Sequence, residues 1–225
     1  MASGNLTFLF GIGGASCSGK TTVSKIVARE LELSSRLNVN VVHQDSYYKT
    51  ELDDVYLADV NFWNFDSTDA IDFAKLLQHV QLLRAENCCR SKVSIIIVEG
   101  SMIYNFKPLL DMLEQKFFFT INKNSSMLRR RRRKYEIADV ECYFENYVWP
   151  SYLNSLKMAE ENADSFLFVN GEDELEANIS YKLRSGTVEA KIVETAKIYQ
   201  RNGKYVDKAA IDFIFFNVQS RNFNL

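Results

Sequence analysis

Two kinds of hydrophobic pattern alternate along the chain. Short continuous apolar runs are typical of buried strands, and longer segments with apolar residues every three or four positions are typical of helices packed on one side. The runs predict strands at 6–12, 39–43, 93–98, 116–121 and 165–169. The spacing predicts helices over 22–33, 70–84, 125–135, 141–162 and 172–183, with a kink at Pro150. This alternation indicates an α/β fold, a five-stranded parallel sheet with helices on both faces.

The last part of the chain is harder to assign. Residues 187–201 carry a helical stripe, and residues 211–216 are strongly apolar. We therefore divide the chain into a domain over 1–186 and a C-terminal extension over 187–225. We expect the extension to pack against the domain. The alternative is a surface for self-association, because an exposed patch this apolar would be a liability.

A glycine-rich motif lies between the first predicted strand and the first predicted helix. The sequence Gly14-Ala15-Ser16-Cys17-Ser18-Gly19-Lys20-Thr21 matches G-x-x-x-x-G-K-[ST], the phosphate-binding P-loop. In such a loop backbone N–H groups surround phosphate oxygens, and the helix N-terminus adds its partial positive charge. Lys20 would reach the β- and γ-phosphates of ATP, and the Thr21 hydroxyl would bind Mg²⁺. A chance glycine-rich turn is the weaker interpretation, because both flanks fit the motif.

Composition narrows the classes of partner. The chain has 225 residues, 47% hydrophobic and 25% charged, with a net charge of −2. A net charge this close to zero gives no electrostatic field that would attract nucleic acid or an anionic membrane. No apolar run reaches the length of a membrane span. We predict no signal peptide at the N-terminus. The four cysteines form no metal spacing and no disulfide framework, so we expect a cytoplasmic protein.

Two carboxylates follow predicted strands, where ligands bind in parallel α/β sheets. Asp45 follows the second strand and could accept a proton from an attacking hydroxyl or hold Mg²⁺; a turn or N-cap role is the alternative. Glu99 follows the third strand, where an acid is costly unless it is paired or near a metal. It is therefore a candidate carboxylate on the Mg²⁺ side and a rival to Asp45 as the base. We interpret both histidines, His43 and His79, as structural.

Six basic residues, 129–134, lie on a predicted helix. Arg129 and Arg133 are i,i+4 neighbours, and Arg130 and Arg133 are i,i+3 neighbours, so one face could present several guanidiniums to a polyphosphate. We expect an arginine-bearing lid that closes over ATP. A solvated face or a nucleic-acid patch is the alternative. Upstream, Phe65 and Asp66 together suit a ring with a ribose diol, although from composition alone a loop aromatic covering the core is the better explanation of Phe65.

Together these residues resemble the nicotinamide riboside kinase family, a branch of the P-loop kinases near uridine kinase. The resemblance covers residues 6–183 and is most specific at 104–109 and 143–152. It implies transfer of the ATP γ-phosphate to the 5′-hydroxyl of a pyridine riboside, with Mg²⁺, as a step of NAD biosynthesis. The nearest alternative is a uridine or cytidine kinase. A P-loop regulatory protein without turnover and a nucleic-acid-binding module are further alternatives.

The resemblance also implies roles for individual residues. The ATP site would comprise Gly14, Ala15, Ser16, Cys17, Ser18, Gly19, Lys20, Thr21, Thr22, Arg129, Arg133, Glu172 and Asp173. Thr21 and Asp45 would hold Mg²⁺, and Asp45 would be the base. The riboside site would comprise Asp45, Ser46, Tyr47, Tyr48, Phe65, Asp66, Arg130 and Tyr135, in which Phe65 and Tyr135 sandwich the ring while Asp66 and Arg130 hold the ribose hydroxyls. Separately, Glu136 would repel the carboxylate of nicotinic acid riboside, or else point to water.

Overall fold

The computed structural model describes residues 7–35, 38–87, 94–135 and 137–172. The predicted helix after Glu172 and the extension over 187–225 lie outside these ranges, as does the boundary between the two expected parts of the chain. Glu136 and Asp173 lie outside them as well. Among the helices that are described, none is long and apolar enough to cross a membrane.

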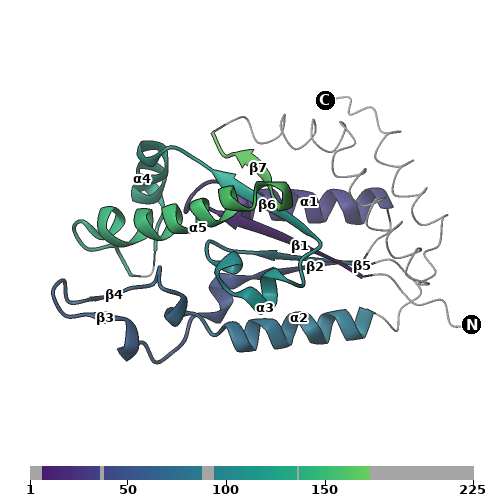
Figure 1. Cartoon of the computed structure of the whole chain (residues 1–225), viewed down its shortest axis with the longest axis horizontal. Helices are drawn as coiled ribbons and strands as arrows, with labels where there is room; N and C mark the ends of the chain where they lie inside the picture. The colour runs from purple at the N-terminus through teal and green to yellow at the C-terminus, as the bar shows by residue number, and fades with distance from the viewer. Residues whose placement is uncertain (1–6, 36–37, 88–93, 136, 173–225) are drawn as a thin grey trace, which may run out of the picture.

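The predicted five-stranded parallel sheet is confirmed (Figure 1). Its strands are β1 (Thr7–Gly14), β2 (Asn38–His43), β5 (Ser94–Glu99), β6 (Gln115–Thr120) and β7 (Leu167–Asn170). They lie in the order β2-β5-β1-β6-β7, and every pairing between them is parallel. All residues of β1 and β5 are buried, which explains why these two strands read as nearly continuous apolar runs.

Helices cover both faces of the sheet, also as predicted. They are α1 (Lys20–Ser35), α2 (Phe73–Asn87), α3 (Lys107–Leu110), α4 (Lys123–Arg132) and α5 (Trp149–Glu161). Successive strand residues point to opposite faces. Leu9, Ile96 and Phe118 accordingly share one core cluster with residues of α2, α3 and α5, and Phe8 and Ile95 share the other with residues of α1.

Two helix boundaries differ from the prediction. The predicted helix over 70–84 begins at Phe73, because residues Thr68–Ala70 form a separate 3₁₀ turn capped by the Ser67 side chain. The predicted helix over 125–135 ends at Arg132, and Arg133 is extended with φ −79° and ψ 134°. Arg133 therefore does not lie on the helical face that carries Arg129 and Arg130, and the predicted i,i+4 arrangement is wrong.

The predicted helix over 141–162 is divided into two parts. A π-helical turn, Phe144–Val148, comes first, and α5 follows from Trp149. Pro150 lies in the first turn of α5, where its missing N–H leaves no helical hydrogen bond unmade. The irregularity expected at Pro150 thus takes the form of a wide turn before α5.

A short hairpin at the strand-end side of the molecule was not predicted. Strands β3 (Tyr56–Leu57) and β4 (Phe62–Trp63) pair antiparallel, and they lie at the same end of the molecule as α4 (Figure 1). Phe62 packs in a small third core with Tyr143, Phe144 and Val148. The hairpin is therefore anchored to the segment that leads into α5.

Candidate active site

The P-loop has the backbone that its glycines predict. It runs from Gly14, the end of β1, to Lys20, the start of α1. Gly14 has φ +122°, and a Cβ there would lie 2.2 Å from the carbonyl oxygen of Phe119. Gly19 also has a positive φ, 97°, and Cys17 adopts the left-handed region with φ 57°. The loop can therefore turn tightly against β6 at the N-terminus of α1.

Lys20 is folded back into this loop. Its Nζ donates a hydrogen bond to the carbonyl oxygen of Ala15 at 2.6 Å, and the residue is buried. Burial lowers the pKa of the Lys20 ammonium, while the negative charges of Glu99 and Asp45 oppose that shift. The side chain thus lies beside the phosphate-binding backbone.

Glu99 is the last residue of β5 and is almost fully buried. Its negative charge acts on the Lys20 ammonium. Its Oε1 accepts a hydrogen bond from the Thr21 hydroxyl at 3.0 Å. The Nδ1 atom of His43 lies 2.6 Å from the same oxygen. The buried acid is therefore paired, as its position after an apolar run required, and one of its partners is a histidine that sequence reasoning had assigned to structure alone.

Asp45 is exposed in a 3₁₀ turn, Gln44–Tyr47, that directly follows β2. The turn is anchored by Gln44, which is fully buried and whose Oε1 accepts a hydrogen bond from the Met102 backbone N–H at 2.8 Å. Gly100 makes room for it, because a Cβ at that position would lie 2.4 Å from the Gln44 Cβ. The glycine after Glu99 therefore serves the neighbouring turn that carries Asp45.

The donor set fits Mg²⁺ bound together with a nucleotide. The Thr21 hydroxyl donates a hydrogen bond to Glu99, so the lone pairs of its oxygen remain available to a metal. The Asp45 carboxylate, just after the end of β2, is exposed. Mg²⁺ prefers oxygen ligands and is usually held by one or two protein oxygens plus substrate phosphates. Within the described ranges no three His, Cys, Asp or Glu side chains form a group that could hold a metal ion.

Asp66 is largely buried on the other side of the site. Its Oδ2 accepts a hydrogen bond from the Tyr143 hydroxyl at 3.1 Å and lies 3.9 Å from Nη2 of Arg130. Burial raises the pKa of the Asp66 carboxyl, although the positive charge of Arg130 lowers it. Ser151 donates to the Asp66 carbonyl oxygen at 2.8 Å, so the start of α5 fixes this residue from behind.

Arg130 connects Asp66 to the P-loop. Its Nε and Nη2 donate to the two carboxylate oxygens of Asp139 at 2.6 and 2.9 Å, and its Nη1 donates to the Ser16 hydroxyl at 3.0 Å. Burial acts to lower the pKa of Arg130, but the hydrogen bonds to Asp139 and the charge of Asp66 outweigh it and raise that pKa. Asp139 was not identified from the sequence, because its partner lies nine positions away across a loop.

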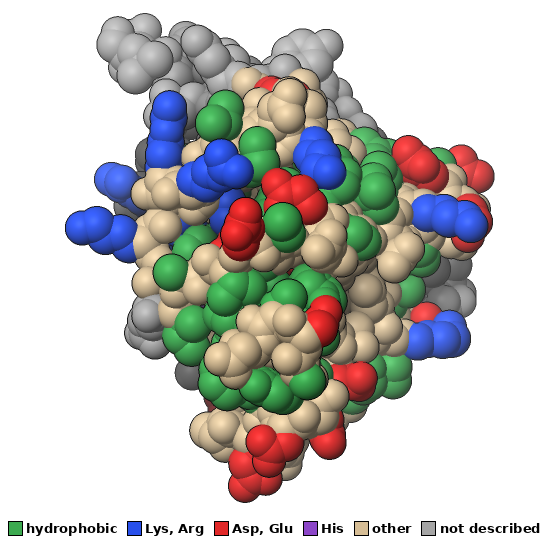
Figure 2. All heavy atoms as spheres, turned by 90° about the vertical axis from the view of Figure 1, so that its left-hand side faces the viewer, with side chains coloured by type: hydrophobic (Ala, Val, Ile, Leu, Met, Phe, Trp, Pro, Cys, Tyr) green, Lys and Arg blue, Asp and Glu red, His purple; other side chains and the backbone are tan. Residues whose placement is uncertain are grey.

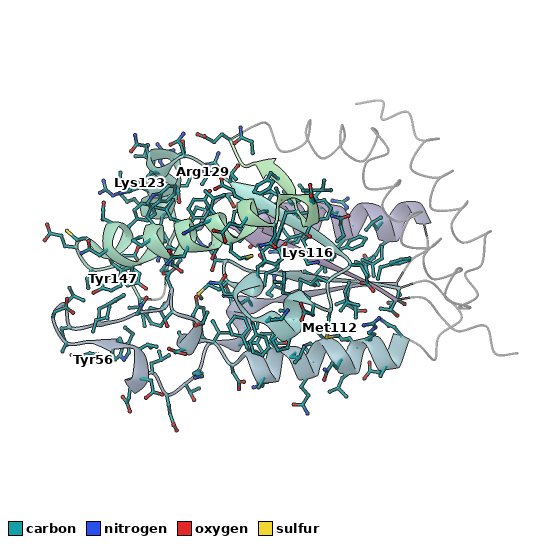
Figure 3. All side chains as sticks on the ribbon, viewed as in Figure 1. Tyr56, Met112, Lys116, Lys123, Arg129 and Tyr147 are labelled. Carbon is teal, nitrogen blue, oxygen red and sulfur yellow. The ribbon has the colours of Figure 1, made fainter. Side chains whose placement is uncertain are left out.

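The other two candidate arginines have different contacts: Arg129 lies against the P-loop, and Arg133 lies over the ring of Tyr135. Arg129 donates from Nη1 to the carbonyl oxygens of Gly171 and Cys17, at 2.8 and 3.3 Å. Figure 3 shows Arg129 on α4. The guanidinium carbon of Arg133 lies 5.0 Å from the ring centroid of Tyr135, as does that of Arg130. Arg129 and Arg130 therefore contact the loop directly, and Arg133 lies over Tyr135, which itself reaches the loop at Cys17.

The two predicted ring-stacking residues have different surroundings. Phe65 packs edge-on against Tyr48, with ring centroids 5.8 Å apart, and the Tyr48 hydroxyl donates to the Phe65 carbonyl oxygen. Tyr135 lies between the arginines and the P-loop, its hydroxyl 3.7 Å from the Cys17 sulfur. Burial raises the pKa of Tyr135 to about 12. The sandwich of a ligand ring between Phe65 and Tyr135 stays a prediction.

Three further candidate residues are placed as follows. Tyr47 is buried, and its hydroxyl is hydrogen-bonded to Nδ1 of His79 on α2, so its ring belongs to the core. Ser46 is exposed beside Asp45. Glu172 accepts a hydrogen bond from the Ser125 hydroxyl at 2.7 Å, which lowers the pKa of its carboxyl, and it also contacts Asn122, the N-cap of α4. Glu172 thus ties the turn after β7 to α4.

A cavity of about 360 Å³ adjoins this site beside α4. Its lining combines apolar and charged side chains: Met127, Arg130, Arg131, Asp139, Val140, Glu141, Cys142, Phe144 and Glu145. Figure 2 shows acidic, basic and hydrophobic side chains close together on this end of the molecule. The cavity shares Arg130 with the predicted riboside residues, so it lies next to that group and does not coincide with it.

Comparison with known proteins places the chain in a family. No protein-family model matches it. Nicotinamide riboside kinase 1 of Rattus norvegicus is 32% identical over 157 residues, which cover 65% of this chain and 77% of that protein. The chain belongs to the nicotinamide riboside kinase family. A uridine kinase of Mycoplasma genitalium is 29% identical over 181 residues, 71% of this chain and 84% of that protein. The kinase described here is therefore a nucleoside kinase.

Among solved structures, a sugar kinase from Janibacter sp. HTCC2649 is 15% identical, covers 80% of this chain and 92% of its own, and has a TM-score of 0.47. The fold of the present chain follows from its own strand order, β2-β5-β1-β6-β7, and from the helices on both faces of its sheet.

Proposed function

We propose that the protein transfers the γ-phosphate of ATP to the 5′-hydroxyl of nicotinamide riboside, and gives the mononucleotide that serves NAD synthesis. Nicotinic acid riboside is the second candidate substrate. The observation that carries this proposal is the link from Ser16 in the P-loop, through Arg130, to the buried carboxylate of Asp66. A ribose held by the arginine–carboxylate pair would lie next to the phosphates that it receives.

The phosphate half of the site would act mainly by positioning and by charge. Backbone N–H groups of residues 14–22 and the Lys20 ammonium would stabilise negative charge that develops on the transferred phosphoryl group. Mg²⁺, held through Thr21 and Asp45, would neutralise the β- and γ-phosphates when bound. Glu99 already accepts two hydrogen bonds at Oε1, from Thr21 and His43.

Asp45 is the better candidate for the base. Its carboxylate is exposed at the end of β2, whereas that of Glu99 is buried and engaged with Thr21 and His43. A base must reach the hydroxyl proton that it removes, and an exposed carboxylate on an anchored turn meets this requirement. Asp45 would therefore take the proton of the 5′-hydroxyl as the oxygen attacks phosphorus.

The pyridine ring supports the choice of riboside. The glycosidic nitrogen of nicotinamide riboside is quaternary, so the ring is cationic, and a cation over an aromatic face is stabilised by about 0.5–2 kcal/mol. The rings of Phe65 and Tyr48, with the nearby carboxylate of Asp66, suit such a cation. A neutral uracil is better served by directional amide hydrogen bonds, which makes uridine and cytidine the less favoured substrates.

The arginines after Ser126 would serve ATP as a lid. Arg129 and Arg133 lie against the P-loop and Tyr135, and Glu172 fixes the start of α4. Guanidiniums that already converge on the loop need little rearrangement to contact a bound polyphosphate.

The test is an ATP-consumption assay with nicotinamide riboside, nicotinic acid riboside, uridine and cytidine. We expect kcat/KM for nicotinamide riboside to exceed that for uridine about tenfold, the effect of roughly one cation–π contact. Equal or greater kcat/KM for uridine or cytidine would contradict the proposed ring choice. Absence of riboside-dependent ATP consumption with all four would contradict the kinase activity itself.

A further inference from the structure

We propose that His43 is a positioning residue for the magnesium–nucleotide site: it fixes the carboxylate of Glu99, which in turn holds the Thr21 hydroxyl in the orientation that binds the metal. This inference rests on the proposed function, because it concerns the same Mg²⁺-ATP site. It adds a residue that is not part of the P-loop motif, since His43 lies on β2.

The sheet register brings the three side chains together. His43 is the last residue of β2 and pairs with Glu99, the last residue of β5, which on its other side pairs with Ile12 of β1. Thr21 reaches the same carboxylate from the first turn of α1. Two donors from different elements therefore meet at Oε1 of Glu99, with Thr21 Oγ1 at 3.0 Å and His43 Nδ1 at 2.6 Å.

The direction of these hydrogen bonds matters for metal binding. An ionised carboxylate can only accept, so the Thr21 hydroxyl must donate its proton to Glu99, and its lone pairs then point away from the carboxylate. If the Glu99 carboxylate turns, the hydroxyl turns with it. The contact with His43 resists that rotation, because a short hydrogen bond to a carboxylate is among the stronger kinds.

Within the described parts of the chain, no other side chain takes this role. Lys20 acts on Glu99 through its charge, but its own hydrogen bond goes to the Ala15 carbonyl oxygen. The side chain of Glu99 is 4% exposed and that of His43 33% exposed, so the imidazole also stands between the carboxylate and solvent. Residues that orient a metal ligand in this way typically change metal affinity about 10–100-fold when they are removed.

The experiment measures Mg²⁺-dependent binding of a fluorescent N-methylanthraniloyl derivative of ATP, in the absence of riboside. The variants are His43→Ala, His43→Asn and, as a matched control, His79→Ala, which removes the other histidine and its hydrogen bond to Tyr47. We expect His43→Ala to raise the Mg²⁺ concentration for half-maximal binding about tenfold. Affinity measured in EDTA should stay within about twofold of wild type, because the P-loop contacts are unaltered.

The Asn variant separates positioning from stability. The Asn Nδ2 can occupy the place of His Nδ1, so His43→Asn should recover most of the wild-type Mg²⁺ dependence, whereas His43→Gln, whose donor lies one bond further out, should not. His79→Ala should lower thermal stability without a shift in Mg²⁺ dependence. These two comparisons keep the test valid if His43→Ala fails to fold.

The possible failures are distinguishable. If wild type shows Mg²⁺-enhanced binding and His43→Ala shows the same dependence, the inference about His43 is wrong and the proposed function stands. The inference is also wrong if Asn and Gln at this position behave alike. If wild type binds the nucleotide equally with and without Mg²⁺, both the proposed Mg²⁺-ATP site and the role of His43 are contradicted.

Discussion

The two halves of the candidate site are built in different ways. In the phosphate half, Lys20 and Thr21 belong to one short motif, and they meet Glu99 where neighbouring strands end. In the riboside half, Arg130 is held by Asp139, a loop residue, and Asp66 by Tyr143, far along the chain. The first half is fixed mainly by the P-loop backbone and by the sheet register that brings His43 and Glu99 together, and the second by ion pairs and hydrogen bonds between distant segments.

This difference teaches where each half should be sensitive. A site held by regular elements should lose chemistry, but not structure, when a functional side chain is removed. A site held by a chain of side-chain contacts should lose substrate affinity when any one contact is removed, because the remaining groups are then free to reorient. The variants below test that distinction, in order of decreasing expected effect.

Asp45→Asn should lower kcat about 10²–10⁴-fold with little change in the KM for riboside, because a base acts in the transition state. Because Asp45 would also hold Mg²⁺, its substitution should raise the Mg²⁺ requirement as well. Glu99→Gln should raise the Mg²⁺ requirement without a comparable loss of kcat at saturating Mg²⁺, since Glu99 accepts a hydrogen bond from Thr21. Steady-state kinetics at several Mg²⁺ concentrations separate the two effects. If Glu99→Gln is the more damaging in kcat and Asp45→Asn alters only the Mg²⁺ dependence, the two carboxylates have the opposite roles.

Lys20→Ala should lower turnover about 10²–10³-fold, because the ammonium stabilises charge that develops on the phosphoryl group. The thermal midpoint should not fall, since burial of this ammonium disfavours its charged form, as its lowered pKa shows. Lys25→Ala, on the exposed face of the same helix, is the matched control for turnover and for melting. Near-normal activity of the purified Lys20 variant would contradict phosphotransfer at this loop.

Arg130→Ala should raise the KM for riboside about 10–100-fold, the value of hydrogen bonds to charged groups, with a smaller effect on kcat. Its neighbour Arg131 is exposed and serves as the control, with Arg131→Ala expected within twofold of wild type. Equal effects of the two substitutions would show that α4 contributes only general positive charge. That result would remove the distinction between the two halves of the site.

The smallest effect concerns stability and pH at Asp66. Burial raises its pKa above 3.8 in spite of Arg130, so the folded protein retains a proton that the unfolded chain has lost. The contribution of Asp66 to stability is therefore greatest below the unfolded pKa and is lost as pH rises through the folded pKa. The free energy of unfolding of wild type, minus that of Asp66→Asn, should fall as pH rises above about 4, the pKa of an unfolded aspartate.

Urea titrations at each pH give that difference, with Asp69→Asn at an exposed position as the control. A difference that rises with pH would show that Arg130 outweighs burial at Asp66, and that the pair is better regarded as a simple ion pair. A constant difference would place Asp66 in an environment no different from that of the unfolded chain.

The phosphate half could be predicted from the sequence because its signals are local. Gly14 and Gly19 are required by backbone conformations that few other residues adopt, and an acid directly after a buried strand must find partners. The central strands β1 and β5 followed most clearly from apolar runs, since strands buried on both faces leave no polar alternation. Lys20, Thr21 and Glu99 are accordingly where the motif and the strand order put them.

The riboside half was less predictable because its contacts join distant residues. The end of α4 at Arg132 leaves no strong sequence signal, so Arg133 was placed on the wrong surface. Asp139 and Tyr143 gain their roles only from the fold, through contacts with Arg130 and Asp66. In the phosphate half the same holds for His43, which the sequence pattern does not connect with Glu99. Helical spacing alone does not reveal such pairings.

The most direct test of the central claim is the identity of the product. Purified protein, ATP, Mg²⁺ and nicotinamide riboside are followed by ³¹P NMR, which distinguishes ADP from a new phosphomonoester and shows the coupling of its phosphorus to the 5′ protons. The account predicts one ADP for each 5′-phosphomonoester of nicotinamide riboside, with both products formed about 10²–10³-fold more slowly by Lys20→Ala. ADP formed at the same rate without riboside, or a phosphomonoester at another hydroxyl, would contradict it.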